Sequence, residues 1–245
     1  MKQIYTIFFL LLFTFGTLDA FSQAWSIKQD ADFPGGGREH AVSFVIDNIA
    51  YLGRGGTPNF GSNGGSYRSK DFWQYNPQYE QWTQIAADFP GRERAGAVAF
   101  VINGKGYVGL GSGNNGNLFK DFYEYTPATR TWTRIADFPG TARYGATAFS
   151  IGNAGYVGTG SDRDGSPTGD FYKYENGQWT QIASIPNNTE KEYATSFSID
   201  GYGYIFLGGD ILFVTADTTT NTTLPQIHGQ QKTTMYLSMK FQAMY

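Results

Sequence analysis

Apolar residues along this chain are grouped in short runs that are separated by residues favouring tight turns. The run 97–102 (AVAFVI) is apolar throughout, which is typical of a strand buried on both faces. Asn103-Gly104 follows it as a hairpin signal, and 106–110 continues as a second apolar strand. The pattern therefore predicts an antiparallel hairpin.

Two further strands are expected directly after this hairpin. Residues 121–125 (DFYEY) alternate aromatic and polar side chains, as a half-buried strand does. Thr126-Pro127 ends that strand, and 132–135 (WTRI) is expected to form the next one. Together the four segments predict one antiparallel, four-stranded sheet.

The same motif occurs four times, at intervals of 48 to 56 residues between one central phenylalanine and the next. Each copy begins with a basic residue, has a Phe six positions later and a Tyr seven positions beyond that. In the first three copies an Asp-led aromatic strand then leads to a Trp. The basic residues are Arg38, Arg94, Arg143 and Lys191; the Phe–Tyr pairs are Phe44–Tyr51, Phe100–Tyr107, Phe149–Tyr156 and Phe197–Tyr204; the Asp–Trp pairs are Asp71–Trp82, Asp121–Trp132 and Asp170–Trp179.

A single sheet of this kind cannot bury its aromatic face, whereas copies stacked around an axis can. The recurring glycines, the Tyr, the Asp-led strand and the Trp resemble the kelch motif over residues 25 to about 215. The resemblance implies an all-β, kelch-type β-propeller with about four four-stranded blades. In particular, the chain is similar to exported kelch proteins of environmental bacteria.

The number of blades leaves two alternatives open. Trp25-Ser-Ile-Lys has the pattern of a fourth strand with no repeat before it, and 210–215 has that of a third strand in the last repeat. The N-terminal strand would then complete the last blade and close a four-bladed ring. Kelch propellers usually have six or seven blades, so an incomplete ring that forms an open arc is the alternative.

The two ends of the chain depart from the repeat. Residues 1–22 predict a signal peptide, because Lys2 precedes the apolar stretch 4–18 and small residues follow it. That stretch is short for a membrane span, so we expect no stable membrane insertion after cleavage. An N-terminal anchor is the alternative. The expected location is secreted, periplasmic or in the cell envelope of a bacterium. Residues 216–245 are Thr-rich and predict an irregular tail.

Composition excludes several kinds of chemistry. The chain has 245 residues with a net charge of −3, so nothing points to nucleic acid as a partner. It has no cysteine, which excludes disulfides, thiol catalysis and the Tyr–Cys cofactor of copper oxidases that resemble galactose oxidase. The two histidines, His40 and His228, form no metal-binding spacing. We expect no cofactor and no metal.

Candidate ligand-binding residues fall where each first strand begins. In a propeller the connections between blades and those between strands two and three emerge on one face, called the loop face here. Arg38, Arg94, Arg143 and Lys191 are expected at this face as a basic ring that binds an anionic group such as a carboxylate. The alternative is that each arginine bonds blade-connecting carbonyls or a nearby acid and shapes the loop.

The loop face also carries variable loops at 54–70, 112–120 and 161–169, which fit a recognition surface on a rigid frame. Tyr144 and Tyr193, together with Tyr67, could offer aromatic faces to a sugar ring, or could pack at the seam between blades.

Aspartates in two other patterns carry weaker signals. Asp162-Arg-Asp164-Gly165 contains half of a calcium loop, but a simple Asp-Gly turn is the favoured interpretation. Asp71, Asp121 and Asp170 are regular, one per repeat, and are expected to bond backbone amides at the start of a strand.

Three functional hypotheses remain. The first is a non-enzymatic module that binds a glycan or a protein ligand through the loop face, with oligomeric state left open. The second follows from a resemblance to exported sialic-acid mutarotases, which implies a sugar mutarotase or epimerase. Such an enzyme would need a complete six-bladed ring with Arg and Glu or His near the axis, and Arg94, Arg143, Glu192 and His40 are the nearest matches. The third is an incomplete arc that assembles with another chain.

Overall fold

The computed structural model describes residues 32–57, 67–85, 89–185, 192–206 and 211–215. These residues form strands and connecting loops, without a helix among them. The sheets belong to one compact unit that begins at Phe33. No helix within the described part of the chain is long and apolar enough to cross a membrane.

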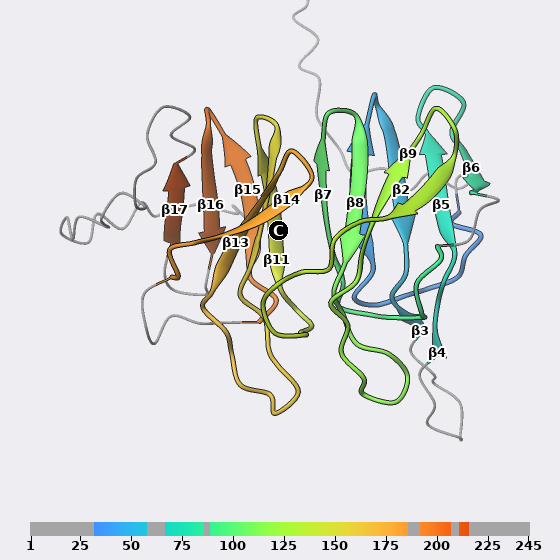
Figure 1. Cartoon of the computed structure of the whole chain (residues 1–245). Helices are drawn as coiled ribbons and strands as arrows, with labels where there is room; N and C mark the ends of the chain where they lie inside the picture. Colours follow the sequence, from blue (N-terminus) through green and yellow to red (C-terminus); the bar gives the residue numbers. More distant parts are fainter. Residues whose placement is uncertain (1–31, 58–66, 86–88, 186–191, 207–210, 216–245) are drawn as a thin grey trace, which may run out of the picture. The chain divides into compact units, whose positions relative to one another are not determined.

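Four antiparallel sheets follow one another along the chain, and each has its strands in chain order (Figure 1). The first contains β1 (Val42–Ile46), β2 (Ile49–Gly53), β5 (Phe72–Asn76) and β6 (Gln81–Gln84). The second contains β7 (Val98–Ile102), β8 (Lys105–Gly109), β9 (Phe122–Thr126) and β10 (Thr131–Arg134). The third contains β11 (Thr147–Ile151), β12 (Ala154–Gly158), β13 (Phe171–Glu175) and β14 (Gln178–Ile182). The fourth contains β15 (Thr195–Ile199), β16 (Tyr202–Phe206) and β17 (Ile211–Thr215).

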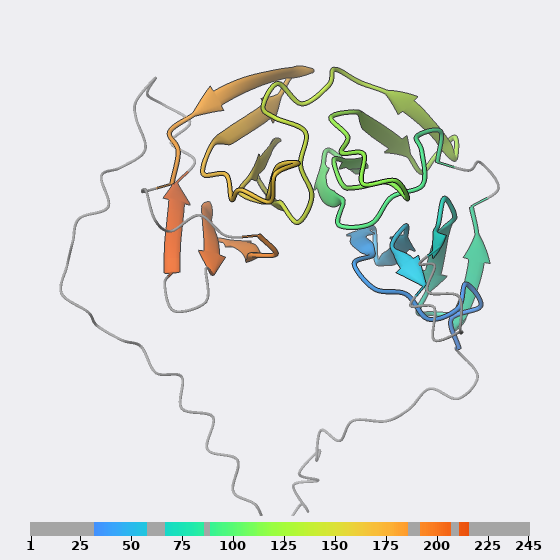
Figure 2. The same cartoon turned by 90° about the horizontal axis from the view of Figure 1, so that it is seen from below.

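These sheets are the blades that the repeat predicts, and Figure 2 shows each one beside its neighbours in the sequence. A short ribbon of β3 (Gly56–Thr57) and β4 (Tyr67–Arg68) lies in the loop between the second and third strands of blade one. The hairpin predicted at Asn103-Gly104 joins β7 to β8, and both residues have positive φ, 51° and 70°, as a type I′ turn requires. The strand predicted in the last repeat is β17.

A phenylalanine of each blade packs on a glycine of the next blade. Phe44 covers Gly106, Phe100 covers Gly155 and Phe149 covers Gly203. A Cβ atom at these three glycines would lie 2.5, 2.2 and 2.1 Å from the phenylalanine ring, respectively. Glycine is therefore required because the ring of one blade lies directly on the backbone of its neighbour. This contact explains two features of the repeat, the central Phe and the Gly before the Tyr.

In blades one and four, side chains on the faces that pack against a neighbouring blade elsewhere are exposed to solvent. Phe197, the fourth of the central phenylalanines, is 41% exposed, whereas Phe100 is 3% exposed. Val45 on the other face of blade one is 60% exposed. Blade one also has Ala50 at the position that is Gly106, Gly155 or Gly203 in the other blades. The proposed closure through Trp25, the signal peptide at 1–22 and the tail at 216–245 lie outside the described residues.

Gly155→Ala tests the seam. The added methyl group would meet the Phe100 ring at 2.2 Å, so we expect a loss of about 1–3 kcal/mol in the free energy of unfolding. Chemical denaturation measures it. Gly37→Ala is the matched control, because nothing lies within 4 Å of that position. Equal denaturation midpoints for Gly155→Ala and wild type would contradict the seam.

Candidate functional site

The backbone just before each first strand links the four blades in series. Two positions after each basic residue lie His40, Gly96, Gly145 and Tyr193, and all four have positive φ, between 51° and 63°. The amide of Gly96 donates to the carbonyl of His40 (3.1 Å), that of Gly145 to Gly96 (3.0 Å) and that of Tyr193 to Gly145 (2.6 Å). We call this chain of hydrogen bonds the inner ladder. It places equivalent residues of all four blades next to one another.

Two of the four ladder positions carry side chains, and these side chains touch. The rings of His40 and Tyr193 are stacked with centroids 4.7 Å apart. A Cβ atom at Gly96 would lie 3.3 Å from the Tyr193 hydroxyl, and one at Gly145 would lie 3.2 Å from the Tyr193 ring. Tyr193 therefore lies across both glycines and reaches from blade four to blade one. Positive φ is unfavourable for His and Tyr, and such strain is concentrated at functional sites.

Tyr144 and Glu192 extend this pair. The rings of Tyr144 and Tyr193 meet edge to face with centroids 6.1 Å apart. A hydrogen bond to Glu192 raises the pKa of Tyr144, and burial followed by the nearby Glu192 raises that of Tyr193. Both phenols are therefore protonated near neutral pH and can donate hydrogen bonds. We call His40, Tyr144, Glu192 and Tyr193 the His40 cluster; Tyr193 is 46% exposed, so the cluster is open to solvent.

The arginines predicted to form a basic ring lie inside the blades instead. Arg94 and Arg143 are 0% exposed, and the side chain of Arg38 is 5% exposed. Each makes a two-pronged ion pair within its own blade: Arg94 with Asp121 (2.6 and 2.7 Å), Arg143 with Asp170 (2.6 and 2.9 Å) and Arg38 with Asp71 (2.8 and 3.0 Å). Lys191 lies outside the described residues.

Each arginine also fixes the bend that follows the second strand. The guanidinium group donates to a carbonyl sixteen residues later, at Arg54, Leu110 or Thr159. These three acceptor residues have positive φ, so the arginine holds a strained bend in place. Phe33, Phe89 and Phe138 cover the guanidinium groups at 4.6, 5.3 and 5.0 Å.

This geometry corrects two expectations. The alternative given for the arginines, that each bonds connecting carbonyls and a nearby acid, describes Arg38, Arg94 and Arg143. None of these three offers a free guanidinium group to a ligand from solution. The aspartates at the start of each third strand do stabilise the blade, but chiefly by accepting from these arginines, with a backbone amide as an additional donor at Asp71. The rule that regular residues are structural applies to the arginines as much as to the aspartates.

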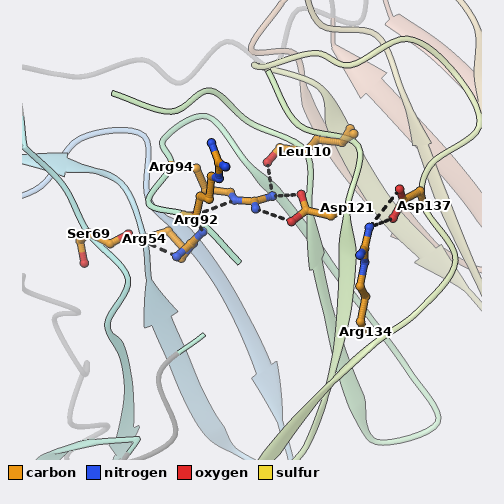
Figure 3. A network of polar contacts seen from close by, with 8 residues as sticks. All are labelled: Arg54, Ser69, Arg92, Arg94, Leu110, Asp121, Arg134 and Asp137. Carbon is orange, nitrogen blue, oxygen red and sulfur yellow. Dashed lines mark hydrogen bonds and ion pairs between the residues drawn. The ribbon is translucent and has the colours of Figure 1, made fainter. Parts of the chain in front are cut away.

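Arg54 is a buried cation that the repeat pattern did not predict. It is 0% exposed and donates to the carbonyls of Ser69 (3.3 Å) and Arg92, with no carboxylate in ion-pair contact among the described residues (Figure 3). Burial and the nearby Arg94 lower its pKa well below the usual value. The sequence signal was present, because blade one has R-G-G where the next two blades have L-G-S and T-G-S.

The remaining candidates are turns and core side chains. The carboxylate of Asp162 accepts from the amides of Asp164 and Ser166, both at 3.0 Å, which is the Asp-Gly turn favoured over a calcium loop. No group of three metal-binding side chains occurs in the described part of the chain. The Tyr67 side chain lies outside what the structure describes.

The chain is similar in sequence to bacterial epimerases and in structure to a solved protein. The N-acetylneuraminate epimerase of Shigella flexneri serotype 5b (strain 8401) is 40% identical over 89 residues, which are 36% of this chain and 23% of that protein. The enzyme of the same name from Escherichia coli K12 is 39% identical over a stretch of the same length. A solved structure, titled "Structure of YjhT", superposes with a TM-score of 0.63 at 22% identity, over 71% of this chain and 59% of that one. The chain has the β-propeller fold.

The similarity to these proteins covers only part of each of them. No protein-family profile matches the chain. The matched stretch spans less than a quarter of the curated epimerases, and the structural match spans 59% of the solved propeller. What this chain shares with the solved structure, over the matched 71% of its residues, is the propeller fold.

Asp121→Asn tests the structural role of the ion pair. It leaves Arg94 charged and buried without a carboxylate, so we expect a loss of about 3–5 kcal/mol in the free energy of unfolding. Urea denaturation measures it. Asp137→Asn is the control, because its pair with Arg134 is largely exposed and should change the free energy of unfolding far less than the buried pair does. Equal losses in the two variants would contradict the assignment.

Proposed function

We propose that this protein binds a sugar at the His40 cluster, outside the cytoplasm. The observation that carries the proposal is the stacked His40–Tyr193 pair. It is an open aromatic surface held by strained backbone, and it joins the segments that precede the first strands of blades one and four. Aromatic faces stack on the apolar side of sugar rings, and the protonated hydroxyls of Tyr144 and Tyr193 can hydrogen-bond the sugar hydroxyls.

The relatives support the choice of ligand class. The matched proteins are named for N-acetylneuraminate, an acidic sugar. Arg68 supplies positive charge near Tyr193, where its electrostatic effect opposes the rise in the pKa of the phenol that burial, Glu192 and Glu39 cause. Its guanidinium group donates to the carbonyl and the hydroxyl of Ser112, which fixes it between blades one and two. A carboxylate bound beside Tyr193 would be attracted by this charge.

Titration with N-acetylneuraminate and with neutral hexoses, followed by saturation-transfer NMR, tests sugar binding. Tyr193→Gly removes the stacking surface and keeps the positive φ that Gly96 and Gly145 already have at this position, so the fold should be retained. We expect at least about a tenfold loss of affinity, corresponding to ~1.4 kcal/mol.

Tyr79→Ala is the matched control, because Tyr79 is 65% exposed and lies in the turn between β5 and β6. Its affinity should equal that of the wild type. If no sugar binds the wild type, or if Tyr193→Gly binds as the wild type does, the proposal is wrong.

A second candidate function is mutarotation of the bound sugar acid, and the names of the relatives favour it. The reaction needs a base that takes the proton from the anomeric hydroxyl and an acid that protonates the ring oxygen as the ring bond breaks. Closure on the other face then returns both protons. His40, Glu192 and the two tyrosine hydroxyls of the cluster are groups of the required kinds.

His40→Asn tests the catalytic role of His40, because Asn tolerates positive φ but cannot act as a base. Since His40 is also part of the stacked pair, sugar binding is measured on the same variant and the rate is compared at saturating sugar. Exchange NMR of the two anomers measures the interconversion rate at constant pH. We expect wild type to accelerate it over buffer and His40→Asn to lose roughly 100-fold or more of that acceleration. A wild-type rate equal to that of buffer would exclude mutarotation, and sugar binding would stand independently.

A further inference from the structure

A concave site, separate from the His40 cluster, lies on the loop face between blades two and three. It is a pocket of about 640 Å³, within the ~300–1,000 Å³ typical of small-molecule sites. Its walls are the connection entering blade two, the loop between β8 and β9, the end of β10 and the loop between β12 and β13. None of its lining residues belongs to the His40 cluster.

The pocket contains more cations than carboxylates. Four basic side chains line it, together with two carboxylates. The basic residues are Arg92, Lys120, Arg134 and Arg163, and the carboxylates are Asp121 and Asp137. This composition contrasts with the net charge of −3 of the whole chain. The positive charge is therefore local to the pocket.

Both carboxylates already have cationic partners. Asp121 is paired with buried Arg94 at 2.6 Å, and Asp137 is paired with Arg134 at 2.8 Å, as Figure 3 shows. Three of the four basic side chains, those of Arg92, Lys120 and Arg163, thus have no carboxylate within ion-pair distance among the described residues. Lys120 donates only to the Pro139 carbonyl, at 3.4 Å.

The buried guanidinium group of Arg54 lies behind the pocket wall and adds to the positive potential in the pocket. Arg54 lies 3.9 Å from the Phe89 ring and donates to the carbonyl of Arg92, which is one of the lining residues. Its charge is buried, and no carboxylate of the described residues is in ion-pair contact with it, so water does not screen the charge fully. An anion near Arg92 would offset part of the cost of burying that charge.

The rest of the lining fits a small polar molecule rather than a bare ion. Asn117 can donate and accept hydrogen bonds, and the exposed Arg134–Asp137 pair offers both kinds of group. The aromatic side chains of Phe119 and Tyr123 also line the pocket. We propose that this pocket binds an acidic saccharide through its carboxylate or sulfate group, held by Arg92, Lys120 and Arg163. Arginine forks bind both oxyanions in the same two-pronged way.

Calorimetric titration with two pairs of small saccharides tests the site. Trigalacturonate is compared with its neutral methyl ester, and lactose 3′-sulfate is compared with lactose. We expect at least one acidic probe to bind about tenfold or more tightly than its neutral counterpart, with affinity falling as salt increases. The two acidic probes show whether a carboxylate or a sulfate is preferred.

Variants locate the binding. Arg92→Gln combined with Arg163→Gln removes two exposed charges and should weaken binding of the acidic probe about tenfold or more. Arg130→Gln combined with Lys173→Gln removes equal charge outside the pocket and should bind as wild type does. Thermal melting checks that both variants are folded.

Three results would overturn the proposal. They are equal binding of acidic and neutral probes, no binding of either acidic probe, and unchanged binding in the Arg92→Gln/Arg163→Gln variant. Tyr193→Gly separates this pocket from the His40 cluster. It should leave binding of the acidic probe intact, and loss of binding there would assign the probe to the cluster instead.

Discussion

An arginine–aspartate ion pair inside each of the first three blades holds together the part of the propeller from which the loops arise. The arginine comes from the connection between blades, the aspartate begins the third strand, and the same guanidinium group fixes the bend after the second strand. Breaking one side of such a pair leaves a charge buried, so the sequence is constrained at both positions. Loops anchored in this way can vary in length and composition without loss of the blade.

Contact between blades depends on glycines, whose lack of a side chain lets a ring of one blade lie on the backbone of the next. Phenylalanine rings lie on glycine backbone at each described seam, and glycines at the inner ladder let Tyr193 lie across blades two and three. Where the ladder carries side chains, at His40 and Tyr193, it carries the stacked pair at which we propose sugar binding. The small residues that the seam and the ladder require therefore also shape the surface that a ligand would meet.

Charge is divided between the interior and the loop face. The repeated arginines Arg38, Arg94 and Arg143 are neutralised inside the blades. The basic residues that line the open pocket, Arg92, Lys120 and Arg163, do not recur in all three of these blades. Residues that recur at one offset in every blade serve the scaffold, because each blade has the same packing problem. Residues that break the pattern, such as His40 and Arg163, are free of that requirement, and they take part in the candidate sites.

Periodicity alone determined the all-β class, the four-stranded sheets, the Asn103-Gly104 hairpin and the third strand of the last repeat, because strand alternation and turn chemistry are local properties of the chain. Local pattern left open whether Arg38, Arg94 and Arg143 bind a ligand or bond carbonyls and an acid within the blade, and the structure places all three inside the blades. Whether a basic side chain points to solvent or into a blade depends on the aspartate some thirty residues later, which only the folded sheet brings within 3 Å. The stacking of His40 on Tyr193 was likewise decided by tertiary structure, since it joins the first repeat to the fourth across two glycines.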